Sequence, residues 1–304
     1  MPFSAPPDLQ STHRVQHHKG VTLVVHRDWC AHLSVEALQA GAPLEQWGQP
    51  VLNHGLVGRA QLHVLDTPGG QLVAKALSRG GLLGGVLPGL YMDSWRPVRE
   101  AALAESLKAQ GVPTATVVVA RSARATAGLY RCEIATARLP GTVDLLDALV
   151  SRPVAEWTEL AGAVGRTLGR LHEVGLVHRD MQVKNLLVGA GFERQDSLLP
   201  VIDLDGCEMV GQLGRRERLA ALARFARSLV KRGLLPGRRG IAIALPGQAL
   251  RAFMKAYVST QPELWMGGRS LLLRRLSREL SRQVAIHGLF WRESGLHDQG
   301  PRGR

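Results

Sequence analysis

Cysteine and aromatic residues are scarce in this sequence, and long apolar runs are absent. The three cysteines, Cys30, Cys132 and Cys207, lie far apart without a CxxC pair, which argues against a disulfide framework and against a zinc site. No stretch of roughly 18 apolar residues is present to span a bilayer, and the N-terminus lacks the apolar core of a signal peptide. Because 45% of the residues are hydrophobic, the chain can still bury a core. These features predict a globular, cytoplasmic protein.

Acidic residues are also scarce in the last third of the chain. Residues 213–304 contain 19 Lys and Arg against 5 Asp and Glu, a net charge of +14, whereas the preceding part contains 19 against 20. Such a field attracts polyanions: nucleic acid, anionic lipid headgroups or a phosphorylated substrate. A solvated basic face without any partner explains the charge equally well.

Hydrophobic periodicity divides the chain into a strand-rich part and a helical part. Strands are predicted at residues 21–25, 60–65, 71–77, 116–120 and 129–136, and helices at 34–40, 95–110, 143–150, 155–174, 213–231 and 247–283. The glycine-rich stretch 79–91 is predicted to be a loop, because glycine disfavours a regular helix. Strands that enclose one helix, followed by a run of helices, predict an α+β protein.

A polar cluster follows the predicted helix 155–174. An HRD sequence ends at Asp180, and Asn185 comes five residues later on a loop between a helix and a strand. Phosphoryl transfer to a hydroxyl needs a carboxylate that orients the nucleophile and accepts its proton, and a nearby amide oxygen that binds a metal. Asp203, after a short apolar strand, supplies the further carboxylate that bridges Mg²⁺ to the nucleotide phosphates. The cluster therefore predicts a phosphotransferase site.

Upstream residues complete an ATP site. Lys75, in the sequence LVAK, is placed to hold the α- and β-phosphates, and Glu100, near the start of the helix 95–110, is placed to fix that lysine. Gly55 and Gly58 precede the first hairpin and predict a reduced loop that covers the phosphates. The predicted cofactors are ATP and Mg²⁺.

Each of these residues has a simpler explanation when it is taken alone. Lys75 is also typical of an exposed strand, and Glu100 is typical of a first-turn acid favoured by the helix dipole. A second HRD sequence, ending at Asp28, lacks the asparagine five residues later and is interpreted as the end of a strand. The complete set, in the order that a kinase requires, favours an ATP-dependent phosphotransferase.

Longer runs around these residues carry a family resemblance. They are AKALSRGGL at 74–82, REAALAESLKAQGVP at 99–113, TARLPG at 136–141, LHEVGLVHRDMQVKNLL at 171–187, VIDLDG at 201–206 and RLAALARFARSL at 218–229. They resemble bacterial lipopolysaccharide kinases, which phosphorylate 3-deoxy-D-manno-octulosonic acid (Kdo) or heptose of the inner core. The resemblance covers about residues 51–231.

The resemblance implies a protein-kinase-like fold of two lobes. The small lobe is expected to be a mainly antiparallel sheet with one key helix, and the larger lobe mainly helical. It implies that Asp180 is the catalytic base, that Asn185 and Asp203 bind Mg²⁺, and that Lys75 and Glu100 position ATP. The expected divisions are a lead-in at 1–45, the small lobe at 46–138, the catalytic part of the large lobe at 139–235 and its basic helical end at 236–304.

The acceptor is less strictly defined than the ATP site. Arg179 favours a protein kinase, where such an arginine pairs with a phosphorylated activation loop, but no APE-like motif follows Asp203 and little room remains for a peptide-docking segment. The resemblance implies an anionic glycolipid acceptor, Kdo-lipid A or heptosylated core, and no nucleic acid. A serine/threonine protein kinase and a catalytically silent kinase-like module are the alternatives.

The basic C-terminal segment has a possible role at the membrane if the acceptor is membrane-bound. The segment 270–282 (SLLLRRLSRELSR) has leucines on one side and arginines on another. One interpretation places it on the inner leaflet as a peripheral contact. The other packs it as a basic helix on the large lobe.

Overall fold

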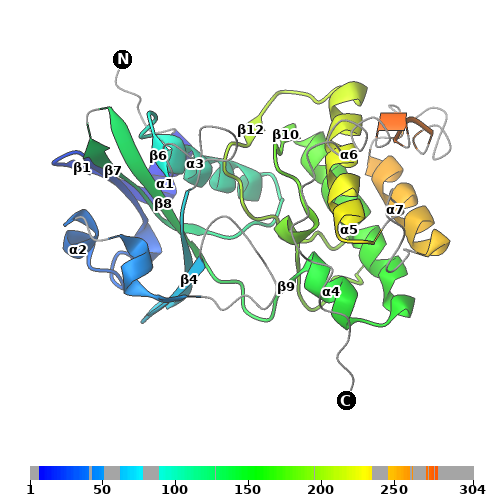
Figure 1. The fold of residues 1–304 in the computed structure, drawn as a ribbon, viewed down its shortest axis with the longest axis horizontal. Coiled ribbons are helices and arrows are strands. Elements are labelled where there is room, and N and C mark those ends of the chain that lie inside the picture. Colours follow the sequence, from blue (N-terminus) through cyan, green and yellow to red (C-terminus); the bar gives the residue numbers. More distant parts are fainter. Residues whose placement is uncertain are drawn as a thin grey trace.

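The computed structural model describes residues 7–40, 43–50, 62–77, 89–126, 128–194, 196–234 and 246–260, together with 262, 272, 274–276, 278 and 279. Strands gather in one lobe and helices in the other (Figure 1). The predicted phosphate-loop glycines, Gly55 and Gly58, and the glycine-rich run at 79–88 lie outside the described residues.

The small lobe is built on an antiparallel sheet with the strand order β1-β2-β7-β8-β5-β4-β3, and β6 also pairs with β8. The strands are β1 (His13–His18), β2 (Val21–His26), β3 (Gln49–Pro50), β4 (Leu62–Thr67), β5 (Gly70–Ala76), β6 (Leu90–Tyr91), β7 (Val117–Thr126) and β8 (Leu129–Ala137). The strands expected near 21–25, 71–77, 116–120 and 129–136 are confirmed.

Strands β6 and β1 were not expected from the sequence. Residues 90 and 91, predicted to be loop, form β6, because β8 extends far enough to pair with them. The segment before residue 45 adds β1 and β2 to the sheet through β7. The division at 45/46 stays a prediction. The second HRD sequence lies where β2 ends, as interpreted, since Arg27–Trp29 forms a short 3₁₀ turn.

The pleat of β5 decides where Lys75 points. Leu72 and Ala74 belong to an apolar cluster on the outer face of the sheet, beneath α2 (Val35–Gln39) and the 3₁₀ turn Leu44–Trp47. Adjacent residues of a strand point to opposite faces. Lys75 therefore points to the inner face, where α3 lies between the sheet and the helical lobe (Figure 1).

Helix α3 (Arg96–Ala109) places Glu100 on its buried stripe. Proline at the start of the helix suits a position whose N–H has no helical partner. The helix ends in a Schellman motif: the Val112 N–H donates to the Leu107 carbonyl, the Gly111 N–H donates to the Lys108 carbonyl, and Gly111 has φ of 74°. Both ends of α3 are thus defined locally, which sets the depth of Glu100 in the lobe.

The large lobe contains α4 (Leu145–Ser151), α5 (Trp157–Glu173), α6 (Arg215–Lys231) and α7 (Gly247–Thr260). Two short antiparallel pairs lie beside them: β9 (Val143–Asp144) with β11 (Leu187–Val188), and β10 (Leu176–Val177) with β12 (Glu208–Met209). The helices expected near 143–150, 155–174 and 213–231 are confirmed, except that residues 143 and 144 form a strand, because they pair with β11. Of the helix expected over 247–283, the part at Gly247–Thr260 is confirmed, and most of the remainder lies outside the described residues.

The described positions of the basic tail pack on the large lobe. Leu272 and Leu276 are buried in the main apolar core, whereas Arg274 and Arg278 are exposed. Leu272 and Leu276 therefore face protein, as the second interpretation of the tail expected.

No helix in the described part of the chain is long and apolar enough to cross a membrane.

Helices α5 and α7 approach each other closely at a glycine. A Cβ atom added to Gly165 would lie 2.4 Å from the carbonyl oxygen of Phe253 and 3.1 Å from the Cβ of Ala256. At Gly162, three residues earlier on α5, the nearest atom outside the helix backbone is the Arg166 Nη1 at 3.4 Å, the end of a flexible side chain. The absence of a side chain at Gly165 therefore allows the two backbones to meet.

Gly165→Ala is expected to lower the free energy of unfolding by about 1–3 kcal/mol, because a methyl group there overlaps backbone that cannot move aside without repacking. Gly162→Ala is the matched control and should raise it by up to about 1 kcal/mol, since alanine favours the helix and has room. Thermal unfolding of the two variants measures both effects. Equal midpoints would contradict the close packing at Gly165.

Candidate active site

Short strands frame the predicted catalytic loop. The loop begins after β10 and ends before β11, and each of these strands is paired, with β12 and β9. His178 is buried, and its Nε2 lies 3.5 Å from the carbonyl oxygen of Ile202. The Ile202 N–H donates to the Asn185 carbonyl over 3.0 Å. These contacts hold the segment that carries Asp203 alongside the catalytic loop.

The Asp180 carboxylate faces solvent and is oriented by a neighbour. The Gln182 amide donates from Nε2 to both carboxylate oxygens, each over 2.8 Å. Asn185 is buried, and its Nδ2 donates to the Asp180 backbone carbonyl over 2.8 Å. The amide oxygen of Asn185 is thereby left for another ligand. Gln182 was not anticipated, because only the folded loop shows that its side chain turns back toward Asp180.

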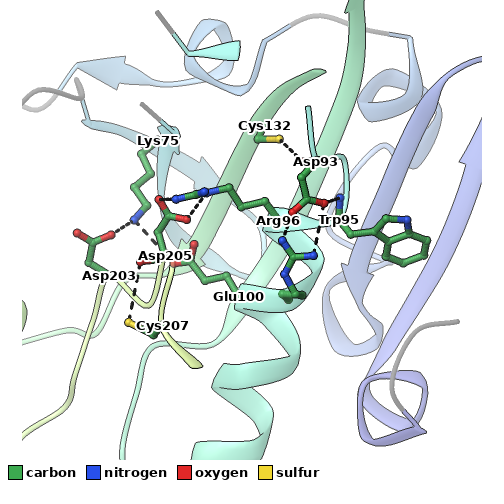
Figure 2. Close-up of polar contacts among 10 residues, drawn as sticks. Lys75, Asp93, Trp95, Arg96, Glu100, Cys132, Asp203, Asp205 and Cys207 are labelled. Carbon is green, nitrogen blue, oxygen red and sulfur yellow. Dashed lines mark hydrogen bonds and ion pairs between the residues drawn. The ribbon is translucent and has the colours of Figure 1, made fainter. Parts of the chain in front are cut away.

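Lys75 lies between two carboxylates from different parts of the chain. Its Nζ is 2.5 Å from Oδ1 of Asp203 and 3.8 Å from Oε1 of Glu100. Figure 2 shows the ammonium pointing to both groups, from β5 toward α3 and the segment after Val201. The structure therefore brings together three residues that the sequence analysis selected separately.

Burial and charge act against each other at these three groups. Burial raises the pKa of Glu100 to about 7, and the Lys75 ammonium only partly offsets that effect. Burial alone would lower the pKa of Lys75, but the carboxylates of Glu100 and Asp203 outweigh it and the net pKa is raised. Burial also opposes ionisation of Asp203, yet Lys75 holds the pKa of that carboxyl below its usual range. Asp203 is therefore ionised near neutral pH.

The backbone at Asp203 is strained. Its φ is 63°, in the left-handed region that residues other than glycine rarely adopt. Such conformations cost on the order of 1–3 kcal/mol and persist where surrounding contacts hold them. Gly206, three residues later, has φ of 68° without this cost. Contacts on both sides of Asp203 are thus needed to keep its carboxylate in place.

One of these contacts is an ion pair between Arg96 and Asp205. The Arg96 Nε donates to Oδ1 of Asp205 over 2.6 Å and Nη2 donates to Oδ2 over 3.0 Å, a bidentate geometry visible in Figure 2. The same guanidinium lies over the Tyr91 ring, 4.6 Å from its centroid. The pair ties the first turn of α3 to the segment that carries Asp203. We call it the α3 clamp.

The α3 clamp was missed by the sequence analysis. Asp205 was given no role beyond standing at the position of the kinase glycine, and Arg96 was not singled out. The two residues are 109 positions apart, so no local pattern pairs them.

Arg179 has a partner within the chain. Its Nη2 lies 2.9 Å from Oε1 of Glu208 on β12, and both side chains are exposed. This carboxylate already supplies a negative partner for Arg179, the role that a phosphorylated residue would have in a protein kinase. Arg179, taken from the sequence as a sign of a protein kinase, therefore gives weaker support to that alternative.

Several kinase-like features lie together at the junction of a β-lobe and a helical lobe. They are a strand lysine paired with a helix glutamate, a nearby ionised aspartate, and an HRD loop with its asparagine. This is the arrangement of a protein-kinase-like phosphotransferase.

Comparison with known proteins supports this class. Residues 54–257 match the Lipopolysaccharide kinase (Kdo/WaaP) family. A 3-deoxy-D-manno-octulosonic acid kinase of Stenotrophomonas maltophilia is 31% identical over 207 residues, covering 65% of this chain and 76% of that protein. One of Photobacterium profundum is 31% identical over 158 residues, covering 50% of this chain and 62% of that protein.

A solved structure of WaaP in complex with acyl carrier protein shares the fold, with a TM-score of 0.52 and 20% identity over 86% of this chain and 98% of that one. The chain belongs to the lipopolysaccharide kinase (Kdo/WaaP) family. It is an ATP-using kinase, and the two-lobed fold inferred from its motifs is confirmed.

Removal of the α3 clamp is expected to weaken the predicted magnesium site at Asp203 more than the fold. In Arg96→Ala, the Mg²⁺ concentration for half-maximal activity should rise about fivefold to tenfold, because Asp203 loses a support worth roughly one charge-assisted hydrogen bond, discounted for partial exposure. Arg99→Ala is the control, since Arg99 lies on the same helix as Arg96 but forms an exposed ion pair with Asp93, which precedes the helix. Mg²⁺ titration of both variants measures the difference, and equal shifts would contradict the role of the clamp.

The Lys75–Glu100 pair should make ATP use depend on pH. Because the Glu100 pKa is raised to about 7, the carboxyl becomes neutral as pH falls through that value, and Lys75 loses one counter-charge. We expect kcat/KM for ATP to decrease on the acid side of about 7. In Glu100→Gln this group no longer titrates, so the decrease of kcat/KM for ATP at acid pH that is due to Glu100 should vanish. The maximal kcat/KM of this variant should also be lower than that of the wild type. The same acid-side decrease of kcat/KM in the wild type and in Glu100→Gln would assign the titration to another group.

Proposed function

We propose that this kinase transfers the γ-phosphoryl group of ATP to a hydroxyl of Kdo, or else of heptose, in a lipid A-linked inner-core acceptor. The observation that carries the proposal is the exposed Asp180 carboxylate, held by Gln182 beside the Lys75–Glu100–Asp203 group. Relatives named as 3-deoxy-D-manno-octulosonic acid kinases support Kdo as the sugar.

Each residue has a role in this proposal. Lys75, fixed by Glu100, holds the α- and β-phosphates of ATP. Asp180 orients the acceptor hydroxyl and accepts its proton as the new phosphate ester forms. The roles of Gly55 and Gly58 in covering the phosphates stay predictions.

Asp203 and Asn185 fit a magnesium site. Asp203 supplies an ionised carboxylate and Asn185 an amide oxygen, which are ligands that Mg²⁺ prefers. Within the described ranges no group of three His, Cys, Asp or Glu could hold a metal, and Mg²⁺ commonly completes its coordination with water and nucleotide phosphates. When bound, the metal neutralises charge on the phosphoryl oxygens.

The segment after Asp203 favours a sugar acceptor over a protein. Only residues 204–214 separate Asp203 from α6, and they include β12, which is paired with β10. Arg179 uses Glu208 of that strand as its partner. Little chain remains to form a peptide-docking loop, which supports a small or lipid-linked acceptor. The retained ATP-site residues speak against a silent module.

Phosphate transfer to purified acceptors tests the proposal. The wild type should phosphorylate Kdo-lipid A, and Asp180→Asn should lower kcat roughly 10²- to 10⁴-fold with little change in ATP binding, because a general base is lost. Asp28→Asn is the matched control, since Asp28 also ends an HRD sequence but is exposed on the turn after β2. Phosphorylated product is measured by mass spectrometry.

Three other outcomes have defined meanings. Transfer to heptosylated core alone would make heptose the acceptor. Transfer only to a generic protein substrate would support the protein-kinase alternative, and bound ATP without transfer would support a silent module. Acceptor in anionic vesicles, compared with acceptor in detergent, tests a peripheral membrane contact through exposed arginines such as Arg274 and Arg278.

A further inference from the structure

Helix α6 contacts the catalytic loop at two points. The Arg224 Nη1 donates to the His178 carbonyl over 2.9 Å, and the Val183 N–H donates to the Ser228 Oγ over 3.0 Å. These helix residues are four apart and so share one face. Arg227 lies three residues after Arg224, on an adjoining part of that face. The second half of α6 thus contacts the loop that exposes Asp180 through Arg224, and Arg227 carries a second positive charge close to Arg224.

These arginines have little negative charge to neutralise them. Within the described ranges, Arg227 has no acidic partner and is half-buried, and Arg224 bonds only to a backbone carbonyl. Burial lowers the pKa of Arg224, the charges of Arg227 and Arg179 lower it further, and Asp180 opposes them. Three guanidinium groups and the Asp180 carboxylate therefore share one electrostatic environment. Glu208 neutralises only Arg179.

Such a cluster is unfavourable until an anion reaches it. Like charges that are partly shielded from water repel one another. A guanidinium presents parallel N–H donors that match the two oxygens of a carboxylate or phosphate. Because Arg224 bonds to the loop backbone at His178, two residues before Asp180, an anion bound there would belong to the molecule whose hydroxyl faces that carboxylate. The cluster is therefore on the acceptor side of the site.

We propose that Arg224 and Arg227 form an acceptor subsite that binds the carboxylate of a sugar acid and presents a hydroxyl of the same sugar to Asp180. This inference rests on the proposed function. It names the carboxylate, and not a phosphate of the lipid anchor, because the carboxylate is attached to the sugar that reacts and must therefore lie within one sugar residue of Asp180.

Arg227→Gln tests the subsite. Loss of one charge-assisted contact should raise the acceptor KM roughly tenfold or more and leave the KM for ATP unchanged. Arg216→Gln is the matched control, because Arg216 is an exposed arginine at the start of the same helix and its loss removes the same charge. The wild type and both variants are assayed with the Kdo acceptor and with its carboxamide analogue. With the carboxamide, the wild type and Arg227→Gln should have similar KM values.

The outcomes separate the subsite from the function. If the wild type phosphorylates the sugar acid and Arg227→Gln leaves the acceptor KM unchanged, the subsite is wrong and the function stands. Equal increases of the acceptor KM in Arg227→Gln and Arg216→Gln would show that a general electrostatic field, and not this subsite, attracts the acceptor. A tenfold loss that persists with the carboxamide would assign the arginines to another anion, such as a lipid phosphate. A wild type that transfers nothing to the sugar acid overturns both proposals.

Discussion

The Lys75 ammonium joins the two lobes through ion pairs. It lies on β5, between Glu100 of α3 and Asp203 of the large lobe. Burial raises the pKa of Glu100 to about 7 even with the ammonium nearby, so the charge of Lys75 favours the ionised form of this carboxyl at neutral pH. The ion-pair network therefore forms only if the pleat of β5, the depth of α3 and the segment after Val201 are all correct.

The neighbourhood of Asp203 shows how the structure maintains a strained residue. Its positive φ is held from one side by Lys75 and from the other by the α3 clamp. The DFG motif of protein kinases has a glycine where this chain has Asp205. The aspartate here gives α3 a charged attachment to the segment that carries Asp203. The position of the helix and the position of the carboxylate are thereby linked.

Helix α6 connects the core of the large lobe to the loop that carries Asp180. Near its start, the buried Arg218 donates to the carbonyls of Leu213 and His172. Two turns later, Arg224 and Ser228 contact the catalytic loop. Part of the basic charge in the last third of the chain is thus structural, and part lies beside Asp180.

The sequence by itself determined the class of fold and selected the candidate residues of the ATP site, because strand and helix periods, the HRD loop and the strand lysine are local patterns. It did not reveal the α3 clamp, the Gln182 contact or the partner of Arg179, and it left the tail undecided. Those features join residues far apart in the chain or depend on side-chain direction. Only tertiary packing, which buried Leu272 and Leu276 and brought Arg96 to Asp205, decided them, since no spacing along the chain encodes a contact across 109 residues.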